Sequence, residues 1–245
     1  MNEKLKQSLK YLKMHHLLQQ GDVYLEEAAK GNPSHSNFLQ LILEKESNVQ
    51  RENARINRIT RASIPIKYTF ETYPFAKQPH SNRKRLEQHY DSLDYVENHR
   101  NVVFIGPTGS GKTGLATAFL VHAVNKGHSG KFITFQDLIG ELQRAMADNS
   151  TQKVIQKYSK VRCLVIDELG YLEMEKAQAG LFFSLMQHRY KKTCTIITTN
   201  LGFKEWDGFF QNPHLTMALV DRLTDNGHII NLKKCVSLRK EAEVD

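Results

Sequence analysis

The chain has 245 residues and a mass of 28.2 kDa, with 40% hydrophobic and 24% charged residues. This composition excludes a wholly disordered chain, and the length predicts one large domain or a core domain with an appendage. The 34 Lys and Arg residues against 26 Asp and Glu give a net charge of +8, which favours a polyanionic partner.

The cysteines and the apolar runs exclude several further classes of protein. The three cysteines, Cys163, Cys194 and Cys235, lie far apart, so neither a disulfide framework nor a zinc ribbon is expected. No apolar run approaches the ~20 residues of a membrane span. Residues 1–20 mix Lys with Leu and lack the apolar core of a signal peptide. We therefore expect a cytoplasmic protein with no membrane partner.

Residues 1–63 read as a small all-helical N-terminal domain. Leu5, Leu9 and Leu12 recur at helical spacing, and Gly21-Asp22 is predicted to interrupt the helix before a short second one over 23–30. A longer helix is predicted from Ser34 or Ser36 to about Arg61. It should end at Ser63-Ile64-Pro65, because the residue before a proline is pushed out of the helical conformation.

Residues 64–245 alternate between short apolar runs and helical patterns. Strands are predicted at Val102–Ile105, Phe132–Phe135, Cys163–Ile166, Thr195–Thr199 and Ile229–Leu232. Helices are predicted near 112–126, 137–147, 151–159 and 177–190. This alternation is typical of βαβ units, and the continuous apolar strands indicate a sheet covered on both faces. We therefore predict an α/β domain with a mostly parallel five-stranded sheet.

Most of the excess positive charge lies between residues 51 and 85, which hold nine basic and two acidic residues, a balance of +7. Four of the basic residues fall on one face of the predicted helix: Arg51, Arg55, Arg58 and Arg61. Like charges in a row repel one another, so this face is either simply solvated or neutralised by an anion. Taken with the motifs below, we interpret it as a stripe that contacts DNA phosphates.

A glycine-rich loop lies between the first predicted strand and the first predicted helix of this domain. The segment Gly106-Pro107-Thr108-Gly109-Ser110-Gly111-Lys112-Thr113, with Gly114 after it, fits the phosphate-binding pattern G-x-x-x-x-G-K-[ST] in full. Its glycines allow backbone N–H groups to surround phosphate oxygens at a helix N-terminus. We expect Lys112 to reach the β- and γ-phosphates of ATP and the Thr113 hydroxyl to ligate Mg²⁺.

Polar side chains follow two other predicted strands. Asp167 and Glu168 come directly after a buried strand, at the edge where ligands of open α/β sheets bind. Asp167 is expected to hold Mg²⁺, and Glu168 to orient and deprotonate the attacking water. Asn200 follows the next strand and either positions that water or forms a turn.

An arginine follows an apolar stretch near the end of the chain. Arg222, in Leu219-Val220-Asp221-Arg222-Leu223, is either a surface residue with a packed aliphatic stem or an arginine finger. A finger would act on the nucleotide of a neighbouring subunit.

These motifs together resemble the IstB-like ATPases, helper proteins of bacterial insertion sequences that are related to DnaC-type helicase loaders. The resemblance rests on the phosphate loop, on Leu-Val-Ile-Asp-Glu-Leu-Gly-Tyr-Leu at 164–172, on Thr-Ile-Ile-Thr-Thr-Asn-Leu at 195–201 and on Leu-Val-Asp-Arg-Leu at 219–223. It implies an AAA+ fold, ATP-dependent self-assembly on duplex DNA of any sequence, and assistance to a partner transposase.

The resemblance also implies residue roles. Lys112 and Thr113 match the Walker A pair, and Asp167 and Glu168 match Walker B. Asn200 matches the sensor-1 residue, and Arg222 matches an arginine that acts in trans on ATP held between subunits of a homo-oligomer. The N-terminal part is similar to a basic attachment that contacts DNA or a partner. The chain departs from the family at Gly114, where His is common, and at Glu173, where Pro is common.

Other functions share parts of this pattern. A helicase loader would have the same nucleotide chemistry and a different partner. A P-loop kinase for a small molecule would explain the loop but not the basic stripe. A nucleotide-gated scaffold without hydrolysis is disfavoured by the carboxylate of Glu168. We therefore predict an ATP- and Mg²⁺-dependent ATPase that DNA stimulates.

Overall fold

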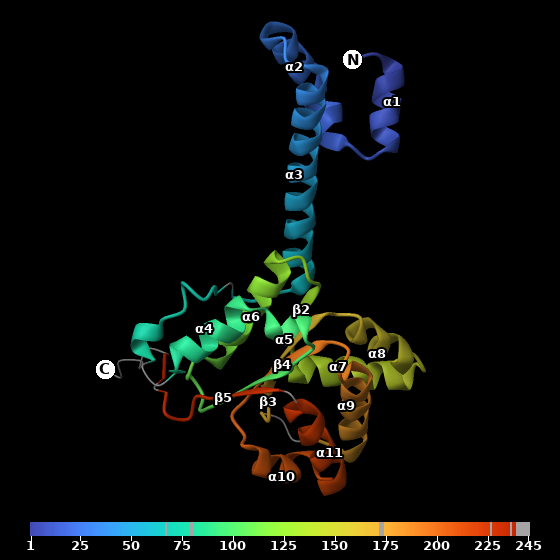
Figure 1. The fold of residues 1–245 in the computed structure, drawn as a ribbon. Helices are drawn as coiled ribbons and strands as arrows, with labels where there is room; N and C mark the ends of the chain where they lie inside the picture. Colours follow the sequence, from blue (N-terminus) through green and yellow to red (C-terminus); the bar gives the residue numbers. More distant parts are fainter. Residues whose placement is uncertain (67, 79–80, 172–173, 226, 236, 239–245) are drawn as a thin grey trace, which may run out of the picture. The chain divides into compact units, whose positions relative to one another are not determined.

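The computed structural model describes residues 1–245 except 67, 79–80, 172–173, 226, 236 and 239–245 (Figure 1). The chain divides into two compact units, Met1–Asn57 and Arg58–Asp245. Among the helices of the described residues, none combines the length and the apolar character needed to cross a bilayer.

The first unit is helical. It contains α1 (Glu3–Tyr11), α2 (His15–Gly31) and most of α3 (His35–Ala62), within which the boundary between the units falls. The side chain of Asn2 caps α1 by accepting a hydrogen bond from the Leu5 N–H. Buried Glu46 of α3 accepts a hydrogen bond of 2.8 Å from the Leu17 N–H in the first turn of α2, and so fixes α2 against α3.

The predicted interruption at Gly21-Asp22 is wrong, because α2 runs through both residues and the helices break earlier, at residues 12–14. Gly21 is buried, and a Cβ atom there would lie 2.7 Å from the Met1 sulfur. The glycine therefore serves close packing rather than helix termination. Asp22 pairs with the N-terminal amino group. By contrast, α3 ends at Ala62, as the proline at 65 predicts.

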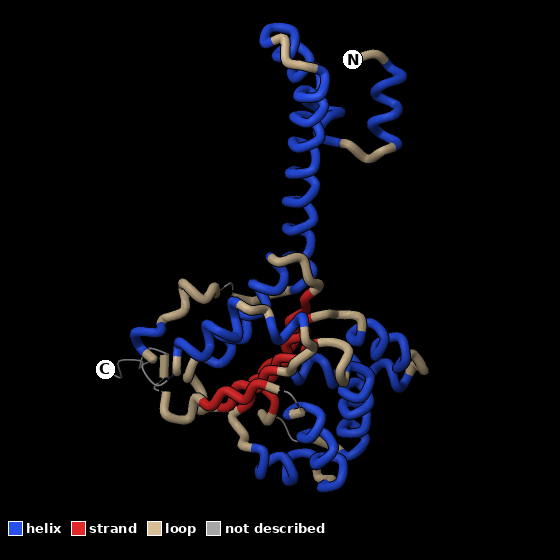
Figure 2. Tube along the Cα trace, in the orientation of Figure 1, coloured by secondary structure: helices blue, strands red, loops and turns tan. Residues whose placement is uncertain are grey.

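The second unit contains one parallel sheet of five strands, which confirms the predicted fold class (Figure 2). The strands are β1 (Val102–Ile105), β2 (Gly130–Thr134), β3 (Cys163–Leu169), β4 (Cys194–Thr199) and β5 (His228–Asn231). Their order is β2-β3-β4-β1-β5, and each neighbouring pair is parallel. All residues of β1 and β4 are buried, as expected for central strands covered on both faces.

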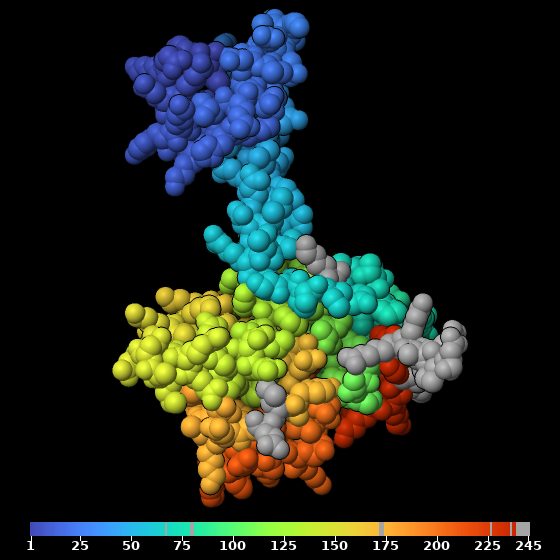
Figure 3. All heavy atoms as spheres, turned by 180° about the vertical axis from the view of Figure 1, so that it is seen from behind, coloured from blue at the N-terminus to red at the C-terminus, as the bar shows by residue number. Residues whose placement is uncertain are grey.

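Helices cover both faces of this sheet. Their bounds are α4 (Arg83–Asp91), α5 (Asp94–Glu97), α6 (Lys112–Asn125), α7 (Phe135–Ala147), α8 (Thr151–Ser159), α9 (Lys176–Arg189), α10 (Trp206–Phe210) and α11 (Pro213–Thr224), with single 3-10 turns at Phe75–Lys77 and Phe203–Glu205. One core packs Phe104 and Phe119 with Tyr95, and the other packs Leu164 with Phe182 and Trp206. On the surface of this unit α7 and α8 lie side by side (Figures 1 and 3).

Four of these helices are absent from the sequence prediction, namely α4, α5, α10 and α11. The helix α4 was interpreted only as part of a basic segment, and α11 only as an apolar stretch beside Arg222. Start signals exist for both, because Asn82 caps α4, and Asn212 caps α11 with Pro213 at its first position.

Candidate nucleotide site

The glycine-rich loop joins the C-terminal end of β1 to the first residue of α6, Lys112. Gly109 and Gly111 have φ angles of +82° and +88°, which L-residues with side chains rarely adopt. At Gly106 a Cβ atom would lie 2.9 Å from the Ser110 hydroxyl oxygen. The loop conformation therefore depends on glycine at these positions.

The side chain of Lys112 is buried within this loop. Its Nζ lies 2.8 Å from the carbonyl oxygens of both Gly106 and Pro107. These neutral acceptors hold the ammonium group at the loop. A phosphate is a stronger acceptor for a charged donor than a carbonyl group is, so the same ammonium is suited to bind an anion there.

The hydroxyl of Thr113 and the carboxylate of Asp167 meet between α6 and β3. The Thr113 Oγ1 atom lies 3.0 Å from each carboxylate oxygen, and the Thr198 hydroxyl of β4 also donates to Asp167. Burial raises the pKa of Asp167, against the opposing effects of Thr198, Thr113 and the charge of Lys112. A hydroxyl and a carboxylate are the hard oxygen ligands that Mg²⁺ prefers, so these residues fit that ion.

Glu168 adopts a different backbone conformation from its neighbour. Its φ angle is +64°, and the register between β3 and β4 shifts between Ile166 and Leu169. The Glu168 N–H donates a 3.0 Å hydrogen bond to the Thr198 hydroxyl. This bulge leaves Asp167 buried while the exposed side chain of Glu168 lines the cavity over the loop.

Thr198 is a site residue that the sequence analysis missed. Its hydroxyl donates to Asp167 and accepts from the Glu168 N–H, so one side chain positions both acidic residues. The signal was a hydroxyl at the end of an apolar strand that pairs with the strand carrying Asp167.

Asn200 follows β4 beside the same edge of the sheet. Its Oδ1 atom is buried and has no hydrogen-bond partner among the residues that the structure describes. A Cβ atom at Gly170, whose φ angle is +105°, would lie 3.1 Å from this oxygen and 2.6 Å from the Leu201 side chain. Glycine after Glu168-Leu169 therefore permits the close approach of Asn200, and the oxygen is available to a ligand or a water.

A cavity of about 240 Å³ lies over the loop. Ile66, Tyr68, Tyr73, Pro74 and Leu238 form its apolar side, and the polar side includes Lys112, Thr113, Glu168, Tyr171 and Thr198. A flat heterocycle with a phosphate tail matches both sides.

The aromatic wall explains Gly114. A Cβ atom at that position would lie 3.2 Å from the Tyr73 ring and 3.4 Å from the Tyr68 ring. Burial raises the pKa of Tyr73, so its hydroxyl stays protonated. Tyr73 belongs to the hydrophobic core as well as to the cavity wall. Glu173 lies outside the described residues.

The structure does not place Arg222 beside the residues of the phosphate loop or the acidic residues after β3. Its Nε donates to Gln187 at 2.7 Å and its Nη1 to the Ala218 carbonyl oxygen at 2.7 Å, with the guanidinium 5.0 Å from the Phe183 ring centre. The Arg222 carbonyl oxygen accepts from Asn101, which immediately precedes β1. The loop follows β1, so the Arg222 backbone and the chain's own phosphate loop lie at opposite ends of that strand.

The four arginines of the predicted DNA-contacting stripe all belong to α3, and two of them have protein partners. Arg55 pairs with Glu52 through two contacts of 2.7 and 2.8 Å. The Nε of Arg58 donates to the carbonyl oxygen of Val124, in the last turn of α6, at 3.2 Å. The stripe is therefore partly neutralised or engaged before any ligand binds. Its other members are Arg51 and Arg61, both exposed.

Comparison with known proteins agrees with this geometry. The family model described as IstB-like ATP binding protein matches residues 7–244. An ATP-binding protein of insertion sequence IS21 from Pseudomonas aeruginosa is 37% identical over 225 residues, covering 92% of this chain and 84% of the relative. The corresponding protein of IS232 from Bacillus thuringiensis subsp. berliner is 34% identical over 231 residues, covering 94% and 92%.

Solved structures show the same fold. The DnaC helicase loader superposes with a TM-score of 0.58 at 24% identity, covering 67% of this chain and 96% of that one. AMPPCP-bound DnaA from Aquifex aeolicus gives a TM-score of 0.58 at 17% identity, covering 70% and 51%.

Proposed function

The chain belongs to the family of IstB-like ATP-binding proteins, and on this premise we propose that it is a Mg²⁺-dependent ATPase that assembles on duplex DNA and assists a transposase. The observation that carries the ATPase part is the set of contacts among Thr113, Asp167, Thr198 and Glu168 beside the phosphate loop. The same contacts support a site that is organised before nucleotide binds.

Each residue has one task in this proposal. The loop N–H groups and Lys112 bind the phosphates of ATP, and Tyr68 and Tyr73 flank the base. Thr113 and Asp167 would hold Mg²⁺, which neutralises charge on the phosphate oxygens. The Glu168 carboxylate accepts the proton of the attacking water, and the free Oδ1 of Asn200 orients that water.

Arg222 supports a homo-oligomer with ATP between subunits. Its backbone lies at the other end of β1 from its own phosphate loop, so its guanidinium is suited to act on the nucleotide of a neighbouring chain. Its present partners, an amide oxygen and a carbonyl oxygen, are neutral, and a γ-phosphate is a stronger acceptor.

The proposals that the protein binds DNA and assists a transposase rest on the charge of α3 and on sequence similarity to the relatives. The arginines of α3 offer a basic face for phosphates, and two relatives are named as ATP-binding proteins of the insertion sequences IS21 and IS232. An insertion sequence encodes its own transposition, so the partner we propose is the transposase of that element.

The test is ATP turnover with and without duplex DNA of several sequences, at low and moderate salt. Stimulation that is independent of sequence and falls with salt is expected, because phosphate contacts release counterions. Adding the transposase of the same insertion sequence, the partner we propose, should increase strand transfer into target DNA only with ATP. ATP turnover that does not change with DNA at either salt concentration would refute the proposal that the protein assembles on DNA. The absence of ATP turnover would refute the proposal that it is an ATPase.

A further inference from the structure

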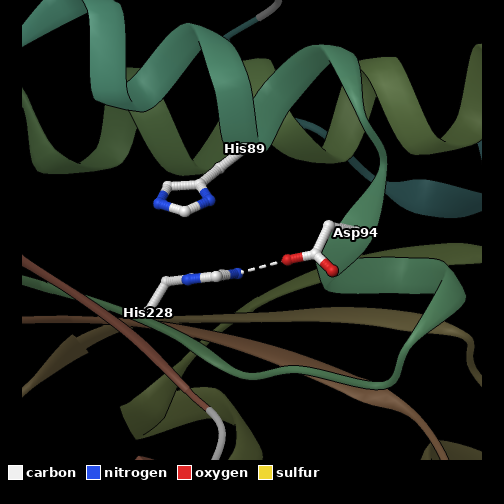
Figure 4. Close-up of side chains that lie close together, drawn as sticks. All are labelled: His89, Asp94 and His228. Atoms are coloured by element: carbon white, nitrogen blue, oxygen red, sulfur yellow. Dashed lines mark hydrogen bonds and ion pairs between the residues drawn. The ribbon is translucent and has the colours of Figure 1, made fainter.

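Two histidines and an aspartate from three elements of the second unit converge away from the phosphate loop (Figure 4). His89 lies on α4, Asp94 begins α5, and His228 begins β5. The His228 Nε2 lies 2.8 Å from Asp94 Oδ2, and the two imidazole ring centres are 3.8 Å apart. One potential ligand atom from each residue lies within 4.8 Å of the other two.

The hydrogen bonding of this cluster is incomplete. The Nε2 atom of His89 is buried and has no hydrogen-bond partner among the described residues. Buried polar atoms are normally paired, so an unpaired imidazole beside a second imidazole and a carboxylate indicates a missing ligand.

We propose that His89, Asp94 and His228 bind a divalent transition-metal ion of the zinc type. Two imidazoles and one carboxylate are a common donor set for zinc, with a fourth position left to water. Ligand atoms around tetrahedral zinc lie about 3.3 Å apart, so the three side chains would have to move closer together. The two imidazoles are stacked, so at least one of them would also have to turn until a nitrogen lone pair of each ring points at the ion. Asn98 donates to the Asp94 Oδ1 atom at 2.8 Å and would hold the carboxylate in place.

Arg100 is the competitor for this site. Its Nη1 lies 3.2 Å from Asp94 Oδ2, the oxygen that also faces His228, and its side chain is 36% exposed. A metal ion and a guanidinium that both contact Asp94 Oδ2 would repel each other strongly. Because Arg100 is long and partly solvated, it can leave for water when the metal binds. The site is therefore one in which Arg100 substitutes for the metal in the metal-free protein.

Metal binding would stiffen one end of the sheet. It ties β5 to α4 and α5, and the His228 N–H already donates to the Asn101 carbonyl oxygen at 2.8 Å. Asn101 in turn holds the Arg222 carbonyl oxygen at 3.1 Å. The bound ion would thus reinforce the contacts that link α11 and β5 through Asn101.

The test is titration of the full chain with Co²⁺, followed by its visible absorption, in excess Mg²⁺ to saturate oxygen-donor sites. We expect one ion per chain with the intense bands of a four-coordinate site, displaced by Zn²⁺. His89→Gln should weaken binding at least tenfold, whereas His122→Gln, which alters a histidine stacked on Tyr90 outside the cluster, should not. Arg100→Gln should tighten binding, because it removes the competing cation and keeps all three ligands.

Thermal unfolding gives a second readout. At Zn²⁺ concentrations near 100 times the dissociation constant, the wild-type Tm should rise by about 5–10 °C. The proposal is overturned if wild type and Arg100→Gln both bind no Co²⁺, or if His89→Gln binds it as tightly as His122→Gln. The first result would identify the cluster as a purely structural contact, and the second would place the metal elsewhere.

Discussion

The two ends of the parallel sheet are built in opposite ways. At the carboxyl end, the hydroxyls of Thr113 and Thr198 both donate to the Asp167 carboxylate, so three elements are bonded together. At the amino end, Arg222 is held by Gln187 and by a carbonyl oxygen of its own helix, both neutral acceptors. The contrast suggests that groups acting within one subunit are fixed in advance, whereas a group proposed to act on a neighbour has partners it can exchange.

The largest expected effect tests Arg222, at the amino end of the sheet. Arg222→Ala should bind ATP normally and lose about 10³-fold in turnover, the scale known for arginine fingers. The matched control is Arg162→Ala, which changes a partly exposed arginine immediately before β3. Nucleotide binding and steady-state turnover, measured over a range of protein concentrations, separate the two functions.

Mixing experiments sharpen this result. Arg222→Ala protein mixed with Glu168→Gln protein should recover part of the lost activity, because some interfaces join intact catalytic residues to an intact arginine. A mixture as inactive as its components would show that Arg222 does not act between subunits.

The next largest effect tests Glu168, at the carboxyl end of the sheet. Glu168→Gln should lower turnover by about 10²-fold or more, the usual contribution of a general base, while ATP binding is retained. Its N–H bond to Thr198 does not depend on the side chain, so the bulge should survive. Asp207→Asn, an exposed acid on α10, is the control. Wild-type turnover in Glu168→Gln would assign the base to another group.

A smaller effect is expected from the arginines of α3. Arg51→Ala with Arg61→Ala should weaken binding to duplexes of every sequence and reduce the slope of log K against log salt by about 1.8, the value for two phosphate contacts. Exposed Lys153 and Lys192, changed together to Ala, match the loss of charge. An equal loss of slope in the control pair would mean that only net charge matters.

Glu52 offers the opposite change on the same helix. It neutralises Arg55 through two contacts, so Glu52→Gln should remove that opposing charge and strengthen DNA binding several-fold. Fluorescence anisotropy with a labelled duplex measures the change. Weaker binding in Glu52→Gln would show that the ion pair positions Arg55 for DNA instead of competing with it.

The sequence predicted the elements whose signals are local. The strand β1 has the predicted bounds, Val102–Ile105, and the loop after it is recognisable because glycine alone tolerates its backbone. The parallel sheet followed from alternating strands and helices. The misplaced helix break at Gly21 shows what local patterns cannot predict. That glycine is needed for close packing against Met1, a contact between residues distant along the chain.

The site residues that were missed depend on register and on tertiary contacts. Thr198 acts because β3 and β4 are neighbours and a bulge at Glu168 presents its N–H to the hydroxyl. No pattern within Thr195–Thr199 reveals which of its threonines faces Asp167. The His89, Asp94 and His228 cluster likewise spans three elements far apart in the chain, so spacing rules for metal ligands do not detect it.

The smallest expected effect concerns the stability that the protein loses by burying ionised Asp167 at the carboxyl end of the sheet. Burial raises the pKa of Asp167 above its usual value of 3.8, so the folded state binds its proton more tightly than the unfolded chain does. Ionised Asp167 therefore destabilises the nucleotide-free protein above that pH, and the penalty disappears as the pH falls toward 3.8 and both states become protonated. Asp167→Asn should raise the Tm at pH 7 by about 2–4 °C, the shift for ~1 kcal/mol, and by less near pH 4.

The same substitution should abolish Mg²⁺-dependent turnover, because an amide cannot replace the carboxylate as a ligand of that ion. Differential scanning calorimetry at both pH values, with Asp207→Asn as the control, measures the stability change. A variant less stable than wild type at pH 7 would mean that the bonds from Thr113 and Thr198 outweigh burial. In that case ionised Asp167 would stabilise the nucleotide-free protein.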